Sequence, residues 1–414
     1  MGNRTIVVVA LLCAIPGLML RMGGYHIGTA SDTALYGLSI VAAAFLLAWS
    51  AEASEVDVAQ GVAVAFIALI AVLPEYAVSM TFAWHAPGDP EQAKFAIANM
   101  TGGNRLLIGA AWPLIVAILY FRTRVGTLIL ERSYSLEVVA LTLATLYSFV
   151  IPFKASVSLL DAAILGVIFV AYVSVLARAP AEDPELVGPA RMIGALPRLQ
   201  RRSVVGALFV YSAGSILASA EPFAHGLVHV GTEIGIDEFL LVQWLAPVAS
   251  EAPEFVVTFI LAWRGRAAVA MGALISSKVN QWTLLVGGLP IAYAVSDRST
   301  AALPLETLAR EEMFLTAAQS IFAVAVLASL SLSGREAVLL FVLFAIQFVA
   351  PVFGELSPGI AVLIEELRVG IGVLYIVLAV LIALRQYRQV GELVGTALQV
   401  FKNPKAFAEA HAEA

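Results

Sequence analysis

Residues 74–84 of this chain read PEYAVSMTFAW, and residues 253–263 read PEFVVTFILAW. Five of the eleven positions are identical, including the opening Pro-Glu and the closing Ala-Trp. At average residue frequencies, chance would give about one match. We therefore interpret the two stretches as copies of an internal repeat, in which a proline and a glutamate stand at the start of an apolar run.

The composition is that of a polytopic helical membrane protein. The 414 residues are 60% hydrophobic and only 13% charged, whereas about 25% of the residues in a soluble domain are charged. Apolar runs recur throughout the chain, and runs of about 18 residues or more are long enough to cross a bilayer as helices. The single cysteine, Cys13, excludes internal disulfides and cysteine-rich metal sites.

We predict twelve membrane-spanning helices. They are expected near residues 4–20, 34–51, 57–84, 92–121, 136–153, 157–177, 203–221, 238–263, 267–296, 311–331, 335–353 and 367–385. With twelve spans both termini share one side, which carries 16 of the 24 Lys and Arg residues against 6 on the other. Because cytoplasmic loops are enriched in Lys and Arg, this bias predicts cytoplasmic termini in a plasma (inner) membrane. Arg105 and Lys278 fall inside predicted spans.

The repeat also predicts how the chain is divided. We expect an extra N-terminal transmembrane helix at 1–33, a first repeat at 34–177, a cytoplasmic linker at 178–202, a second repeat at 203–353, and an extra helix with a cytoplasmic tail at 354–414. The linker is rich in proline and charge, and it is interpreted as a hinge. The first helix is expected to be retained, because no clear small-residue cleavage site follows it.

The two copies are predicted to cross the membrane in opposite directions. In the twelve-span topology, the helix of Pro74 runs outward and the helix of Pro253 runs inward. Inverted repeats are common in secondary transporters, which place one site near the bilayer midplane. Proline leaves backbone carbonyls that protein, water or ions must satisfy. Glu75 and Glu254, beside these prolines, are therefore candidate cation ligands.

Each copy is followed by a helix with a cluster of small and polar residues. The first cluster is ANMTGGNRLLIG at 98–109, and the second is GALISSKVNQWTLLVG at 272–287. The ionisable residues in and around the repeats are Glu75, Arg105, Glu251, Glu254 and Lys278. Each costs at least about 2.5–3.5 kcal/mol at the centre of a membrane helix. We expect these five side chains to meet each other or bound ions.

These motifs resemble those of the calcium:cation antiporter superfamily, which includes the sodium/calcium exchangers. In that family two inverted repeats each carry G-T-S-x-P-E on one helix and G-N-x-x-G-S-N on the next. The resemblance covers roughly residues 34–353. It implies an all-α fold with two inverted repeats of five helices, and a secondary-active cation antiporter that works by alternating access. It implies neither an enzyme nor a cofactor, and the transported Ca²⁺, Na⁺ or H⁺ would be the ligands.

The resemblance also implies the site residues by position. The matched positions are Glu75, Asn99, Asn104, Ser250, Glu254, Ser276 and Ser277. Among these, Glu75 and Glu254 match the two ion-binding glutamates. Asn99 matches the polar residue of the first G-N motif, and it is the third implied metal ligand.

Two positions depart from the family in charge. Glu251 follows Ser250 where relatives carry a hydroxyl, and Lys278 replaces the last asparagine of the second G-S-N. In the first copy, Ala71 and Val72 replace hydroxyl residues. We expect Glu251 to add a carboxylate or carry a proton, and Lys278 to take the place of a cation when no ion is bound. The exchange of Ca²⁺ or Na⁺ for Na⁺ or H⁺ is left open.

Two other functions remain as alternatives. A sodium/proton exchanger would use the same fold, and a cation channel would belong to another class. Symmetric rings of acids favour a channel, whereas paired inverted repeats favour a carrier. No H-E-x-x-H, nucleophile elbow or P-loop motif is present, so no enzyme is predicted. The expected partners are inorganic cations and the lipid bilayer, without nucleic acid, and the oligomeric state is not predicted.

A further stripe of ionisable residues follows the linker. Glu221, His225, His229 and Glu233 recur every four residues and share one face of a helix. Two histidines at this spacing can bind zinc. A solvated face is the more frequent role of such a stripe, so no metal site is predicted here.

Overall fold

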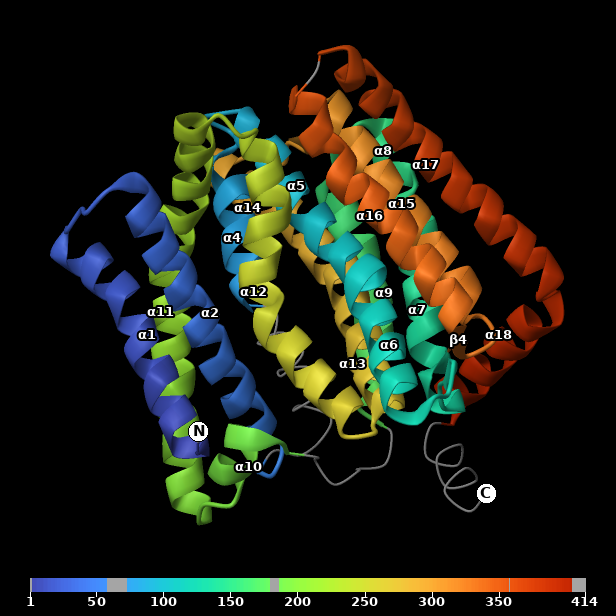
Figure 1. Ribbon diagram of the computed structural model, residues 1–414, viewed down its shortest axis with the longest axis horizontal. Coiled ribbons are helices and arrows are strands. Elements are labelled where there is room, and N and C mark those ends of the chain that lie inside the picture. The colour runs from blue at the N-terminus through green and yellow to red at the C-terminus, as the bar shows by residue number, and fades with distance from the viewer. Residues whose placement is uncertain (1, 58–72, 179–185, 357, 404–414) are drawn as a thin grey trace. The chain divides into compact units, whose positions relative to one another are not determined.

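The structure is a computed structural model that describes residues 2–57, 73–178, 186–356 and 358–403 (Figure 1). The chain forms two compact units. Unit 1 comprises Met1–Phe82 and Pro180–Glu254, and unit 2 comprises Ala83–Ala179 and Phe255–Ala414. Two unit boundaries therefore fall inside α4 (Leu73–His85) and α12 (Glu238–Trp263), the helices that carry the Pro-Glu pairs.

Eight helical segments of the described chain are long and apolar enough to cross a membrane. They are Asn3–Gly23, Thr29–Ser54, Glu91–Thr123, Arg132–Lys154, Leu159–Leu176, Arg198–Ile234, Glu238–Trp263 and Leu367–Arg385. Each coincides with a predicted span, and the all-α polytopic fold is confirmed. The predicted spans at 267–296, 311–331 and 335–353 are also helical. Most of the span at 57–84, including Ala71 and Val72, lies outside the described residues.

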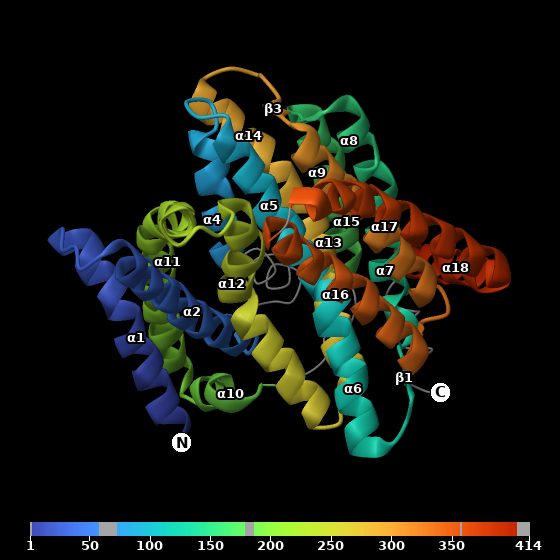
Figure 2. The same cartoon turned by 45° about the horizontal axis from the view of Figure 1, so that its top comes forward.

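Unit 1 is built on α1 (Asn3–Gly23), α2 (Thr29–Ser54) and α11 (Arg198–Ile234), which lie side by side (Figures 1 and 2). Small residues allow their close approach. A Cβ at Gly17 of α1 would lie only 2.7 Å from the hydroxyl oxygens of both Ser39 and Ser219. This is the packing expected of helices in a bilayer, where small side chains let backbones approach.

The described part of the predicted linker is packed against unit 1. Its short helix α10 (Gly188–Gly194) contacts α1, α2 and α11, and buries Ala190 and Ile193 in their hydrophobic cluster. Arg201 Nε and Nη2 lie 2.7 and 2.9 Å from the two carboxylate oxygens of Asp57, which follows α2. Residues 179–185 of the linker lie outside the described residues.

Unit 2 contains two similar successions of elements. The first is α5 (Glu91–Leu106), the π-helical turn η1 (Leu107–Ala111), α6 (Trp112–Thr123), β1 (Thr127–Ile129), the 3₁₀ turn η2 (Arg132–Tyr134), α7 (Ser135–Ser148), α8 (Val150–Lys154), β2 (Ser156–Val157) and α9 (Leu159–Leu176). The second is α13 (Ala267–Asn280), the π-helical turn η3 (Gln281–Leu285), α14 (Val286–Asp297), β3 (Leu303–Pro304), α15 (Thr307–Leu327), β4 (Ser331–Ser333) and α16 (Gly334–Leu356). Helices α17 (Pro358–Arg385) and α18 (Tyr387–Lys402) follow.

The strands join the two successions in a reciprocal way. β1 pairs with β4, with Leu128 opposite Leu332, and β2 pairs with β3, with Val157 opposite Leu303. In each pair, the first strand of one succession therefore meets the second strand of the other. This exchange supports the internal repeat that the Pro-Glu stretches predicted. The boundaries of the compact units differ from those of the predicted repeats, because each unit contains elements of both repeats.

The Asp57–Arg201 pair gives a test of this packing. The hydrogen bond from Arg201 lowers the pKa of Asp57 below its ordinary value of 3.8. The stabilisation is therefore present above the unfolded-state pKa of about 3.9 and is lost as the pH falls through the folded-state pKa. We expect Asp57→Asn to lower the melting temperature of the detergent-solubilised protein at pH 7, and the difference to shrink towards zero below about pH 3.

The matched control is Glu131→Gln, which changes an exposed carboxylate of unit 2. It should leave the melting temperature nearly unchanged. An Asp57→Asn protein that melts with the wild type at pH 7 would show that the ion pair contributes nothing to unit 1.

Candidate functional site

The two Pro-Glu pairs place acids in the parts of two apolar helices that belong to unit 1. Glu75 lies in the first turn of α4 and is 2% exposed. Glu251 and Glu254 lie three residues apart on α12 and therefore share a face. Glu251 is 3% exposed, whereas Glu254 is half-buried. Ionisable groups inside membrane helices are costly and mark ion pathways, so this burial fits a role in cation binding.

The prolines of α12 open its backbone beside these acids. Pro247 and Pro253 have no N–H to donate, so each removes one hydrogen bond of the helix. The Ser250 hydroxyl lies 3.1 Å from the Ala246 carbonyl oxygen and 3.2 Å from that of Pro247, and donates within its own helix. The Ser250 oxygen still has lone pairs that can accept a hydrogen bond or bind a cation.

In unit 2, the predicted residues Lys278 and Asn104 meet directly. Lys278 Nζ lies 2.6 Å from Asn104 Oδ1 and 3.2 Å from the Asn104 backbone oxygen, and 4.4 Å from the centre of the Trp282 ring. Both Lys278 and Asn104 are fully buried. Asn104 Nδ2 donates to the Met100 carbonyl oxygen at 2.8 Å, which turns the amide oxygen towards the ammonium group. The Lys278 ammonium group therefore donates to this amide oxygen.

The positions of the π-helical turns support the predicted pairing of Asn104 with Lys278. The turn η1 begins three residues after Asn104, and η3 begins three residues after Lys278. Aligning the two turns gives the pairing that the family pattern predicts. π-Helical turns within α-helices are frequent at functional sites. One copy of the repeat thus supplies an oxygen, and the other copy supplies the cation that binds it.

The remaining predicted residues of unit 2 lie on the same two helices. Asn99 of α5 is fully buried, whereas Ser276 and Ser277 of α13 are half-buried. The Ser276 hydroxyl lies 3.0 Å from the Tyr172 hydroxyl of α9. A Cβ at Gly272 would lie 2.0 Å from the Tyr134 ring, so glycine allows α13 to approach this aromatic side chain. These groups give α13 several oxygen atoms close to Lys278 in sequence.

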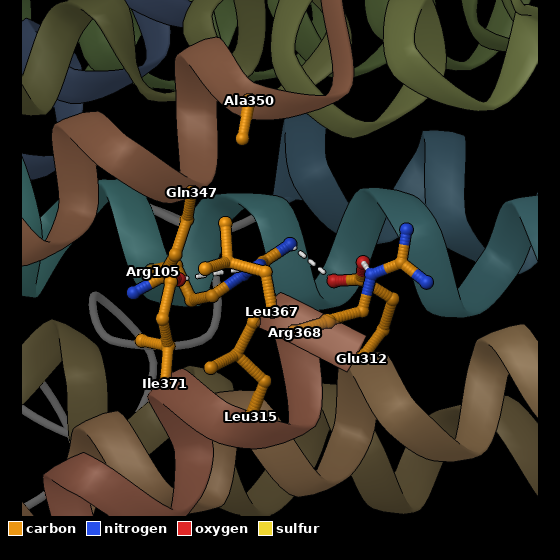
Figure 3. A pocket seen from close by; sticks show the side chains of 8 residues that line it. All are labelled: Arg105, Glu312, Leu315, Gln347, Ala350, Leu367, Arg368 and Ile371. Carbon is orange, nitrogen blue, oxygen red and sulfur yellow. Dashed lines mark hydrogen bonds and ion pairs between the residues drawn. The ribbon is translucent and has the colours of Figure 1, made fainter. Parts of the chain in front are cut away.

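Arg105 belongs to a separate buried network (Figure 3). Arg105 Nη2 forms an ion pair with Glu312 Oε2, and Arg105 Nη1 donates to Gln347 at 3.3 Å. Arg368 of α17 also pairs with Glu312, with 2.9 Å between Nε and Oε1. Gln347 Nε2 donates to the Tyr375 hydroxyl at 2.8 Å. The positive charge of Arg105, which lies inside a predicted span, is therefore balanced by the carboxylate of Glu312.

The partners of Arg105 were not singled out from the sequence. Glu312 lies near the start of a predicted span, and Arg368 was counted among the loop residues. Both lie more than 200 positions beyond Arg105. The sequence shows an acid and a base close to the ends of predicted spans. Their spacing along the chain does not indicate that they contact Arg105.

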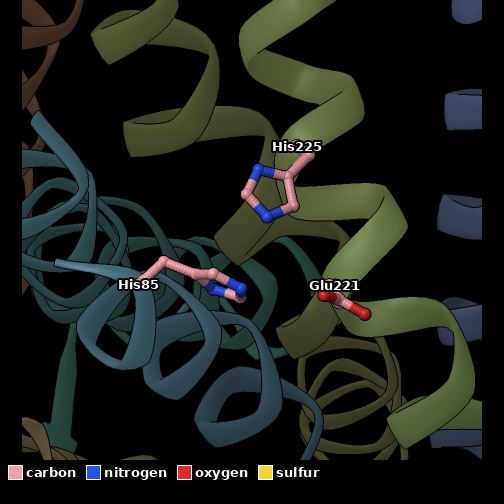
Figure 4. A group of neighbouring side chains, drawn as sticks. All are labelled: His85, Glu221 and His225. Atoms are coloured by element: carbon pink, nitrogen blue, oxygen red, sulfur yellow. The ribbon is translucent and has the colours of Figure 1, made fainter. Parts of the chain in front are cut away.

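The two acids of the ionisable stripe on α11, Glu221 and Glu233, contact neighbouring helices of unit 1. Arg21 Nη2 lies 2.6 Å from Glu221 Oε2, and Thr29 Oγ1 lies 2.8 Å from Glu233 Oε1. His225 follows Glu221 by one turn on the same helix (Figure 4). His85, also drawn in Figure 4, ends α4 and belongs to unit 2. Within unit 1, these two acids therefore link α11 to α1 and α2 through polar contacts.

Repeated helix–π turn–helix segments, buried acids next to proline and a matched Asn–Lys pair are the features expected of a cation antiporter built from a repeat. The sequence matches the family model "Sodium/calcium exchanger protein" over residues 33–178 and 204–353. The chain belongs to this family, so the predicted superfamily is confirmed. Its apolar helices and its family make it an integral membrane protein that exchanges inorganic cations.

Three similar proteins were found. The crystal structure of the H⁺/Ca²⁺ exchanger CAX is 39% identical, covers 97% of this chain and 98% of that chain, and has a TM-score of 0.90. Native YfkE, at 15% identity, covers 84% of this chain and 99% of that chain with a TM-score of 0.62, and shows the fold alone. The putative antiporter CaxA of Alkalimonas amylolytica is 25% identical over 240 residues, 57% of this chain and 71% of the relative. Exchangers and antiporters among the relatives favour transport over enzymatic activity.

The Arg105 network predicts a large effect on stability. Glu312→Gln removes the carboxylate that Arg105 and Arg368 share, and removing one partner of a buried ion pair costs about 3–5 kcal/mol. We expect a clear fall in the melting temperature of the solubilised protein. The control Glu392→Gln alters an exposed side chain of α18 and should change stability by less than about 0.5 kcal/mol.

The double variant Arg105→Met/Glu312→Leu distinguishes lost charge balance from lost packing. Replacing a buried ion pair by apolar side chains of similar volume is often nearly neutral. The double variant should therefore recover most of the melting temperature. If it melts no higher than Glu312→Gln, the loss does not come from the uncompensated charge of Arg105.

Proposed function

We propose that this protein exchanges Ca²⁺ for H⁺ across a membrane by alternating access. The relative that matches over nearly the whole length, at 39% identity, is described as an H⁺/Ca²⁺ exchanger. The observation that carries the choice of counter-ion is the Lys278–Asn104 pair. A permanently attached ammonium group already occupies an oxygen that could otherwise hold a Na⁺ ion. This substitution favours H⁺ over several Na⁺ ions as the counter-ion.

Glu75 and Glu254 are proposed to hold the Ca²⁺ ion, with the Asn99 amide oxygen as a third ligand. Ca²⁺ takes 6–8 oxygen ligands, and backbone carbonyls released by proline can complete the shell. Additional oxygens are proposed to come from Asn104, Ser250, Glu251, Ser276 and Ser277. The acids belong to unit 1 and the amides to unit 2, so their combination in one site is inferred from the repeat and the family.

Charge balance gives the coupling. Two carboxylates carry two negative charges, which one Ca²⁺ ion or two protons neutralise. A site with both glutamates ionised and no ion would keep charge inside the bilayer at a cost of at least about 2.5–3.5 kcal/mol per group. The carrier is therefore proposed to change its access only when Ca²⁺ or protons occupy Glu75 and Glu254. Glu251 can add a carboxylate or hold a further proton.

Lys278 is proposed to compete with the transported cation. Its ammonium group lies on Asn104 Oδ1, an oxygen that an incoming cation would also need. When the ion binds, Lys278 moves away or loses its proton. This competition would weaken Ca²⁺ binding enough to permit release, which a carrier needs as much as capture.

The alternatives differ in which gradients drive flux. A sodium/proton exchanger would move Na⁺ in response to a pH gradient, and a channel would conduct one ion without any gradient of another. We also propose, from the Lys and Arg bias, that both termini lie in the cytoplasm and that the protein resides in the plasma (inner) membrane.

The glutamates provide the direct test of the proposed site. In proteoliposomes, we expect Glu75→Gln and Glu254→Gln each to reduce Ca²⁺ uptake driven by a pH gradient by at least about tenfold, since even outer-shell partners of metal ligands are worth about 10–100-fold in affinity. Glu131→Gln is the control at an exposed position. Near-normal exchange by both glutamine variants, in protein that elutes as a single species, would rule out this site.

The lysine gives a second, opposite effect. Lys278→Gln removes the attached cation and leaves a neutral side chain on Asn104. We expect a severalfold lower apparent KM for Ca²⁺ with a lower maximal rate, because the ion binds more tightly and leaves more slowly. Uptake is measured over a range of Ca²⁺ concentrations, with melting temperature measured in parallel. A raised KM would contradict competition between Lys278 and the ion.

A further inference from the structure

The C-terminal helix α18 (Tyr387–Lys402) has one face buried against unit 2. Leu393, Ala397 and Val400 are each less than one tenth exposed, and the helix contacts α7 and the turn η2. The predicted segment 354–414, an extra helix with a cytoplasmic tail, therefore also includes a helix packed on the first succession of the repeat. This apolar face is explained by its contact with α7.

A second apolar face of α18 remains exposed in the described chain. It consists of Tyr387, Val394, Leu398 and Phe401, which are 63, 43, 53 and 50% exposed. Their spacing of seven, four and three residues places them on one side of the helix. We call these four residues the α18 stripe. The face buried on α7 lies beside it and does not include it.

The third face of α18 is polar. Its exposed residues are Arg388, Gln389, Glu392, Gln399 and Lys402. The helix therefore presents one side to protein, one side to water, and an apolar side between them. A helix with this division fits the boundary between a bilayer and water.

The ends of two membrane-spanning helices place α18 at such a boundary. The span Leu367–Arg385 ends two residues before α18 begins, and α18 touches η2, where the span Arg132–Lys154 begins. Leu381 and Leu384, near the end of α17, are 57 and 68% exposed. Exposed apolar side chains therefore occur on both sides of the end of this span. Figures 1 and 2 show α18 beside α7 and the end of α17.

We propose that α18 lies in the surface layer of the lipid bilayer, with the α18 stripe at the boundary of headgroups and acyl chains. Arg385 and Arg388 at one end and Lys402 at the other can bind anionic phospholipid headgroups. A second copy of this chain is a poorer occupant. Four side chains on one short helix fall far short of the roughly 800 Å² per partner of a stable interface, and two such basic surfaces would repel each other.

This position has a structural consequence for the exchanger. The buried face of α18 lies on α7, and α7 contacts both α13, which carries Lys278, and α15, which carries Glu312. An anchored α18 therefore fixes one end of α7 at the membrane surface.

Site-specific labelling of the full-length protein tests the placement. Cys13→Ser provides a cysteine-free background, in which Leu398→Cys or Gln399→Cys is labelled with an environment-sensitive fluorophore. The two positions are adjacent in sequence, but Leu398 belongs to the stripe and Gln399 to the polar face. The proteins are reconstituted into vesicles of phosphatidylcholine and phosphatidylglycerol, with and without lipids that carry a quencher near the headgroup end of the acyl chain.

We expect the label at 398 to emit at shorter wavelength and to be quenched severalfold more by these lipids than the label at 399. The difference should be smaller in vesicles without phosphatidylglycerol. Equal quenching at the two positions would overturn the proposal. So would a label at 398 that is shielded from water but does not respond to the lipid quencher, if the unlabelled Leu398→Cys protein forms disulfide crosslinks between copies. The readout does not involve transport, so it is independent of the proposed exchange.

Discussion

The cost of charge inside a bilayer is the constraint on which the rest of this structure depends. It accounts for the Arg105–Glu312–Arg368 network, in which one buried carboxylate serves two guanidinium groups. It also accounts for Lys278, whose ammonium group is held by two oxygens of Asn104 and faces an aromatic ring. In the proposed cycle, the same cost prevents empty, ionised Glu75 and Glu254 from changing sides, and so couples one ion to another.

The predicted repeats and the two compact units divide the chain at different places. Two of the unit boundaries fall inside α4 and α12. One unit boundary falls seven residues after Glu75, and another directly follows Glu254. The helices that carry the proposed ligands therefore each contribute residues to both units. The Asn104–Lys278 pair lies wholly within unit 2.

The sequence was sufficient to predict the features that repeat. The Pro-Glu stretches predicted an internal repeat, and the family pattern paired Asn104 with Lys278, which each lie three residues before a π-helical turn. Contacts without a counterpart in the repeat could not be predicted, because Glu312 and Arg368 reach Arg105 only through tertiary packing. Helix α18 was missed for another reason. Its apolar residues are divided between two faces among polar ones, so a search for long apolar runs passes over it.

The central claim is that one Ca²⁺ ion exchanges for protons at two carboxylates. The most direct measurement follows Ca²⁺ and H⁺ fluxes together in proteoliposomes of the wild-type protein, with the pH gradient, Na⁺ gradient and membrane potential set independently. The account predicts Ca²⁺ uptake that requires a pH gradient, moves about two protons per Ca²⁺ ion by the charge balance of two glutamates, and is insensitive to potential and to Na⁺. Ca²⁺ flux without proton counterflow, or flux driven by Na⁺ alone, would contradict it.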